Sequence, residues 1–113
     1  MKEIKAYIQP HKLSDVVMAL RDIPGMTGIS VCEVKGFGRS RAANAKHKII
    51  DGLIAYIPMA KIEIMCADKI VDTIVAEIRK NAFTGLRGDG KIYVSEIIAA
   101  VRISTGESGN EAI

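Results

Sequence analysis

The sequence predicts an α+β domain, because segments with strand-like alternation are interleaved with two segments whose apolar residues repeat at helical spacing. The segments follow the order β-α-β-β-α-β, and residues 36–57, far too many for a hairpin turn, separate the second and third strands. The chain has 113 residues, of which 49% are hydrophobic and 26% charged, as expected of one domain with a modest core. We therefore expect residues 1–113 to form a single domain.

The first strand and the first helix are indicated by their apolar periodicity. Residues 2–9 alternate as a strand does, and Pro10 ends the strand. Apolar residues then repeat at helical spacing over 13–20, with Ser14 or Asp15 as the expected N-terminal cap. The predicted apolar faces are Ile4, Ala6 and Ile8 on the strand and Leu13, Val16, Val17 and Leu20 on the helix.

The remaining elements follow the same two periods. Residues 28–35, 58–66 and 91–95 are predicted strands, and 100–104 is a candidate for a short fifth strand. Asp68 is the expected cap of the second helix, whose apolar stripe comprises Ile70, Val71, Ile74, Val75 and Ile78. Cys32 and Cys66 lie inside strand segments, so we expect both to be small buried residues of a reducing compartment and not a disulfide pair.

This order of elements is the ferredoxin-like, split βαβ plan, with both helices on one face of the sheet. The opposite face would carry Tyr7, Lys61, Glu63 and Met65. Such a face is too apolar to remain in water and too charged to form a core. We infer that another subunit covers it.

Composition and motif content exclude several classes of function. A net charge of only +3 and the absence of tryptophan give no reason to expect nucleic-acid binding. No apolar run reaches membrane-spanning length and the N-terminus lacks the apolar core of a signal peptide, which favours a cytoplasmic protein. We expect no catalytic role, because the sequence offers no nucleophile beside a base and no carboxylate pair. His47 stands between Lys46 and Lys48, whose charges repel a metal ion, so no metal site is expected there.

The most informative stretch is residues 84–91, in which three glycines fall within six positions. Backbone amides in such a turn converge on an anion, and Lys91 adds a positive charge beside them. Gly85, Gly90 and Lys91 have P-loop spacing, but Ile92 replaces the magnesium-binding Ser or Thr, and the loop opens a strand instead of a helix. The loop by itself leaves two interpretations open, a phosphate cradle that is not a P-loop and a plain glycine-rich turn.

The long segment 36–57 is basic. It carries four cationic side chains against Asp51, a net charge of +3 that equals the charge of the whole chain. A basic arm on a neutral body favours contact with an acidic partner or ligand, and a loop kept soluble by its charges is the alternative. The residues we expect to contact a partner are Arg41, Lys46, His47 and Lys48.

Four motifs together resemble those of the PII nitrogen-regulatory signal proteins. They are Glu33-Val34-Lys35-Gly36-Phe37-Gly38-Arg39, Lys61-Ile62-Glu63-Ile64, Thr84-Gly85-x-x-Gly88-Asp89-Gly90-Lys91-Ile92 and Thr105-Gly106-Glu107. The resemblance covers the whole chain and implies a homotrimer that binds ATP or ADP between neighbouring subunits, with Mg²⁺ accompanying ATP. It further implies that residues 36–57 are the T-loop, which docks onto enzymes, transporters or regulators, and that 84–91 and 102–107 are the B-loop and the C-loop region.

The resemblance also assigns site residues. It places the adenine beside Gly28, Ile29 and Ser30, and the phosphates beside the glycine-rich loop and Arg102. The full set of nucleotide-binding candidates is Gly28, Ile29, Ser30, Gly36, Gly38, Arg39, Glu63, Met65, Gly88, Asp89, Gly90, Lys91, Arg102 and Ser104.

Several positions depart from the family pattern. Ser104 replaces a phosphate-binding arginine, Ser40 replaces a glutamine that helps to place magnesium and 2-oxoglutarate, and Met59 replaces a lysine that pairs with a 2-oxoglutarate carboxylate. We therefore expect a weak or absent response to 2-oxoglutarate. Gly52 stands where the family has its uridylylated tyrosine, so we expect no uridylylation.

The expected function is that of a trimeric sensor of adenine nucleotides. Its T-loop would regulate a protein target, an enzyme or a membrane transporter, and such a target would recruit it from the cytoplasm to the inner face of the membrane. The alternative is an adaptor that ignores nucleotides and binds an acidic partner through the basic loop alone.

Overall fold

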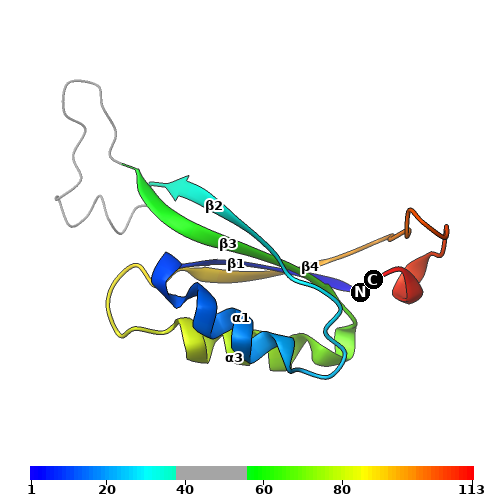
Figure 1. The fold of residues 1–113 in the computed structure, drawn as a ribbon, viewed down its shortest axis with the longest axis horizontal. Helices are drawn as coiled ribbons and strands as arrows, with labels where there is room; N and C mark the ends of the chain where they lie inside the picture. The colour runs from blue at the N-terminus through cyan, green and yellow to red at the C-terminus, as the bar shows by residue number, and fades with distance from the viewer. Residues whose placement is uncertain (38–55) are drawn as a thin grey trace.

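The computed structural model describes residues 1–37 and 56–113, and it confirms the predicted order of elements (Figure 1). The strands are β1 (Lys2–Ile8), β2 (Ser30–Gly36), β3 (Ile57–Cys66) and β4 (Lys91–Glu96). The helices are α1 (Leu13–Arg21) and α3 (Val71–Ala82), and single 3₁₀ turns occupy Pro10–Lys12, Asp68–Ile70 and Gly109–Ala112. The described residues contain no helix that is long and apolar enough to cross a membrane.

The four strands form one antiparallel sheet in the order β2-β3-β1-β4, and both helices lie against one of its faces (Figure 1). This is the ferredoxin-like arrangement that the sequence predicts. The register pairs Ile4 of β1 with Ile64 of β3 and Val94 of β4, so the apolar sets of neighbouring strands share the helix face. The core consists of Ile4, Ala6, Ile8, Val16, Leu20, Ala60, Ile62, Ile64, Cys66, Ile74, Ile78 and Ala82.

The expected helix caps are wrong. A 3₁₀ turn precedes each helix, and its backbone carbonyl accepts the first amide: Leu13 N–H donates to Pro10, and Val71 N–H donates to Asp68. Ser14 and Asp15 therefore lie inside α1 without capping it. The Asp68 carboxylate instead accepts hydrogen bonds from the amino group of Met1, at 2.8 Å, and from Lys2 Nζ, at 3.1 Å.

Two further expectations are corrected by the structure. Residues 100–104 form no strand, because the chain turns back on itself there: Arg102 N–H donates to Glu107 and Gly106 N–H donates to Arg102, each at 2.8 Å. Only an isolated bridge joins Val101 to Ser108 in this part of the described chain. Cys66 is buried as expected, but Cys32 is exposed, because it lies on the edge strand β2 opposite Lys61, on the sheet face that the described residues leave uncovered.

The sheet face away from the helices is open. By register, it carries Tyr7 of β1 opposite Lys61 of β3 and Lys91 of β4. Met65 and Tyr93 on the same face are 37% and 52% exposed, so the described single chain leaves aromatic and sulfur-containing side chains in water. Cover by a second subunit remains a prediction that this surface supports.

Candidate functional site

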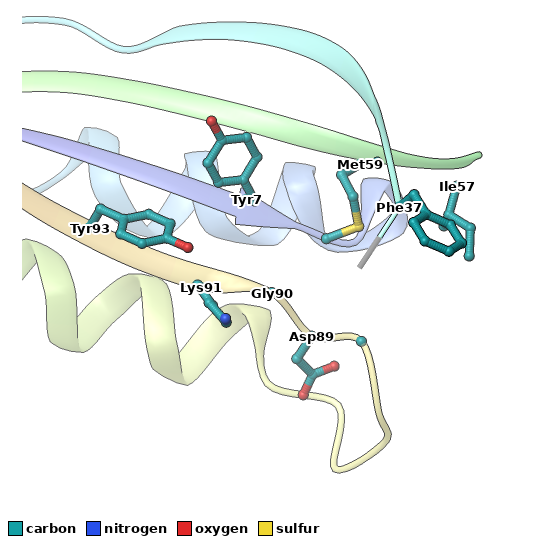
Figure 2. A pocket seen from close by; sticks show the side chains of 10 residues that line it. Tyr7, Phe37, Ile57, Met59, Asp89, Gly90, Lys91 and Tyr93 are labelled. Atoms are coloured by element: carbon teal, nitrogen blue, oxygen red, sulfur yellow. The ribbon is translucent and has the colours of Figure 1, made fainter. Parts of the chain in front are cut away.

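A hollow of about 420 Å³ lies on the open face at the end of the sheet nearest residues 36 and 57 (Figure 2). We call it the lysine hollow, because Lys91 is the one positively charged residue among the described residues that line it. Its floor and walls come from all four strands and from the glycine-rich loop. The lining residues are Tyr7, Gly36, Phe37, Ile57, Met59, Gly88, Asp89, Gly90, Lys91 and Tyr93.

The glycine-rich loop enters this hollow in a conformation that requires its glycines. Gly85, Gly88 and Gly90 have φ values of 83°, 89° and 100°, which other residues rarely adopt. The carbonyl of Gly88 accepts a hydrogen bond from the Gln9 side chain at the end of β1, which ties the loop to the sheet. The loop therefore brings main-chain groups and the Lys91 ammonium to one place, as an anion site needs.

The Asp89 carboxylate closes the loop from within. It accepts a hydrogen bond from Thr84 N–H at 2.9 Å and another from the Thr84 hydroxyl, and Figure 2 shows it between the two arms of the loop. These two bonds are the leading causes that hold the pKa of Asp89 below its usual value. Asp89 thus has a structural role in the loop, and sequence reasoning assigned it only to the ligand.

This clamp predicts a pH-dependent loop. Because the pKa of Asp89 is lower in the folded protein than in the unfolded chain, its contribution is present above about pH 4 and is lost as the pH falls through the folded value. We expect the protection of amides in residues 84–90 against hydrogen exchange, relative to the intrinsic exchange rate at each pH, to fall below about pH 4. Thr84→Val should accelerate this exchange at neutral pH and flatten its pH dependence. Unchanged protection in that variant would contradict the clamp.

A second hollow, of about 540 Å³, lies farther along the open face and meets the C-terminal segment. We call it the arginine hollow, after Arg102, the cation among its described lining residues. The Arg102 guanidinium also donates to the carbonyl of Glu111 at 3.1 Å, and this bond holds one edge of the guanidinium in place. The lining residues are Thr27, Gly28, Ile29, Ser30, Glu63, Met65, Arg102 and Ile113.

The two hollows divide the predicted site residues between them. Gly36, Gly88, Asp89, Gly90 and Lys91 line the lysine hollow, whereas Gly28, Ile29, Ser30, Glu63, Met65 and Arg102 line the arginine hollow. On β3, Met59 lines the first, and Glu63 and Met65 line the second. Met59 is four residues from Glu63 and six from Met65, and these separations correspond to about 14–20 Å along the strand. Each hollow therefore holds one part of the predicted site.

Other predicted residues lie elsewhere. Ser104 is exposed in a turn and lines neither hollow of the described structure. Gly38, Arg39, Arg41, Lys46, His47 and Lys48 fall outside the described residues. Sequence reasoning missed the roles of Gln9 and Thr84 in holding the loop, and it did not assign Tyr93 to the site; only the alternation of residues 91–95 could have placed Tyr93 beside Lys91.

Comparison with known proteins identifies similar chains. The family model described as nitrogen regulatory protein P-II matches residues 1–107. A nitrogen regulatory protein P-II of Bradyrhizobium diazoefficiens is 45% identical over 113 residues, the full length of both chains. The nitrogen regulatory protein P-II of Klebsiella oxytoca and P-II 1 of Escherichia coli K12 show the same identity and the same full coverage.

Proposed function

Because the chain belongs to the nitrogen regulatory protein P-II family, whose members are regulatory signal transducers and not enzymes, we propose that it senses adenine nucleotides. In this proposal ATP or ADP binds at the boundary between two subunits of a homotrimer. The bound nucleotide changes the conformation of segment 36–57, the T-loop of the resemblance. That segment then regulates a protein partner.

The observation that carries this proposal is the division of the site into two partial hollows on one sheet face. Among the described residues, each hollow contributes one cation, Lys91 or Arg102, and the two hollows lie at different positions along β3. A nucleotide with several phosphates is bound more tightly where two cations converge on it. Convergence follows if the lysine hollow of one subunit faces the arginine hollow of the next, since a head-to-tail contact of this kind closes into a ring.

The C-terminal segment supports such a ring. It extends away from the body of the subunit beyond β4 (Figure 1). Ile98 and Ile103 on this segment are 98% and 101% exposed in the single chain. Two fully exposed isoleucines on an extended segment favour contact with another copy, and the same segment carries Arg102 towards that contact.

The chemistry of each hollow suits one part of a nucleotide. In the arginine hollow, Ile29 and Met65 offer apolar contact to a base. In the lysine hollow, the glycine-rich loop and Lys91 offer amides and a positive charge to phosphates. Mg²⁺ would accompany ATP and would be held through the phosphate oxygens.

Titration calorimetry with ATP, ADP and AMP tests the proposal. We expect binding of ATP and ADP, with at most a threefold gain (about 0.6 kcal/mol) in ATP affinity on adding 2-oxoglutarate. The reason is that Met59 is apolar, and Lys91 is the cation among the described residues lining the lysine hollow, too little charge for a phosphate chain and a dicarboxylate together. No heat with any of the three nucleotides at millimolar concentration would end the proposal. Strong synergy with 2-oxoglutarate would contradict only the role of Met59.

A partner of this protein would be an enzyme or a membrane transporter, which would recruit it from the cytoplasm to the inner face of the membrane. The alternative function is an adaptor that binds an acidic partner through the basic segment 36–57 without nucleotide. Ser104 favours this alternative, because a serine in place of the family's second phosphate-binding arginine leaves Arg102 as the cation lining the arginine hollow in the described structure. Partner binding that survives Lys91→Ala would support the adaptor.

A further inference from the structure

An ion pair lies on the open face directly beside the arginine hollow. Lys61 Nζ is 3.0 Å from Glu63 Oε1, and the two side chains are 24% and 31% exposed. They are two residues apart on β3, so they project from the same face of the sheet. Glu63 lines the arginine hollow, and Lys61 is not among its lining residues.

The carboxylate of Glu63 creates an electrostatic conflict in the proposed function. An ionised carboxylate only accepts hydrogen bonds, so it suits the hydroxyl or amino groups of a nucleoside. The same negative charge repels the phosphates of that nucleotide. Among the side chains that line this hollow in the described structure, Glu63 is the carboxylate and Arg102 is the cation proposed to bind phosphate. The charge of Glu63 therefore has to be offset by a group outside the hollow.

We infer that Lys61 is a positioning residue for the nucleotide site: its ammonium holds the Glu63 carboxylate and offsets its charge, so that Glu63 accepts a hydrogen bond from the nucleoside without repelling the phosphates. This inference rests on the proposed function, because it requires an anionic nucleotide in the arginine hollow. In this inference Lys61 raises the affinity for the nucleotide although its own side chain does not contact the nucleotide.

The surroundings of the pair agree with this role. Register places Ser30 of β2 and Lys5 of β1 opposite Glu63, and Cys32 and Tyr7 opposite Lys61. The hydrogen bond and the charge of Lys61 are the largest influences that lower the pKa of Glu63, and the charge of Lys5 is a smaller one. Glu63 in turn raises the pKa of Lys61. The Lys61 ammonium and the Glu63 carboxylate are therefore both charged at neutral pH.

A double-mutant cycle tests the inference. The probe is ATP, and the measurement is its dissociation constant for wild type, Lys61→Met, Glu63→Gln and the double variant. Methionine keeps most of the length of the lysine side chain and removes its charge. We expect Lys61→Met to weaken ATP binding about tenfold when Glu63 is present and to have no measurable effect in the Glu63→Gln background. Lys61→Arg should retain wild-type affinity, and raising the salt concentration should shrink the tenfold loss.

Each result separates the inference from its alternatives. An equal loss with Glu63 present and in the Glu63→Gln background would overturn it, because Lys61 would then contact the nucleotide or support the fold directly. No loss in either background would overturn it as well. If Lys61→Met does not fold, Lys61→Gln, which also removes the charge, takes its place in the same cycle with Glu63→Gln. Wild-type protein that binds no ATP would instead refute the proposed function itself.

Discussion

Replacing Gly90 by alanine should destabilise the protein by about 3 kcal/mol or more, at the upper end of single-residue effects, and should abolish nucleotide binding. Gly90 has a φ of 100°, so any side chain there is strained. A Cβ at this position would lie 2.7 Å from the carbonyl carbon of Tyr7 and closer still to its oxygen. Both neighbours belong to the backbone of the central strand β1, which has no room to move.

The close approach follows from the start of β4. Lys91 pairs with Tyr7, so the residue before Lys91 has to cross the end of β1. A displaced Gly90 would therefore displace Lys91, the cation of the lysine hollow. Thermal unfolding and ATP titration measure the two consequences, and we expect a fall in Tm of about 10 °C or more.

Gly85→Ala is the matched control. Gly85 also has a positive φ, of 83°, but a Cβ there would meet only ring atoms of Phe83, at 3.8 and 3.9 Å. This variant should lower the free energy of unfolding by only about 1 kcal/mol, the cost of placing alanine at a positive φ. The difference between the two variants isolates the contact with Tyr7. If both variants melt at the same temperature, Gly90 does not approach β1 as described.

The sheet and the core could be predicted because their signals are local. Ile4, Ile64 and Ile74 are at most 1% exposed, and each belongs to an alternating or helical apolar pattern that a short window of sequence reveals. The caps were wrong because 3₁₀ turns before α1 and α3 satisfy the first amides through the backbone, which leaves no mark in side-chain type. The exposure of Cys32 was missed because alternation does not tell an edge strand from a central one.

The candidate site could be predicted only in part. Glycine spacing indicated the loop, and its positive φ values fit that expectation. The bond from Gln9 to Gly88 joins residues 79 positions apart, and no pattern of residue types predicts such a contact. The division of the site residues between two hollows is likewise a consequence of strand pairing, which the sequence does not display.

The largest functional effect is expected from removing either of the two cations that the proposed function brings together from neighbouring subunits. Lys91→Ala and Arg102→Ala should each weaken ATP binding by about 10- to 100-fold, the usual range for losing a charge-assisted hydrogen bond. Neither substitution touches the core, because both side chains are exposed in the single chain. Each variant should therefore remain folded and bind ATP only with this weakened affinity. Lys80→Ala removes a similarly exposed cation on α3, away from both hollows, and should bind ATP as wild type does.

Mixing the two defective variants should restore binding. In a trimer that contains both kinds of subunit, one boundary joins an intact Lys91 from one subunit to an intact Arg102 from its neighbour. Random mixing should then regenerate about a quarter of all sites. Calorimetry on subunits mixed by denaturation and refolding should show wild-type affinity at that stoichiometry, whereas Lys91→Ala remixed with itself should show only sites of weakened affinity. If both cations serve a ligand within one subunit, no mixture regains binding, and the placement of the nucleotide between subunits is wrong.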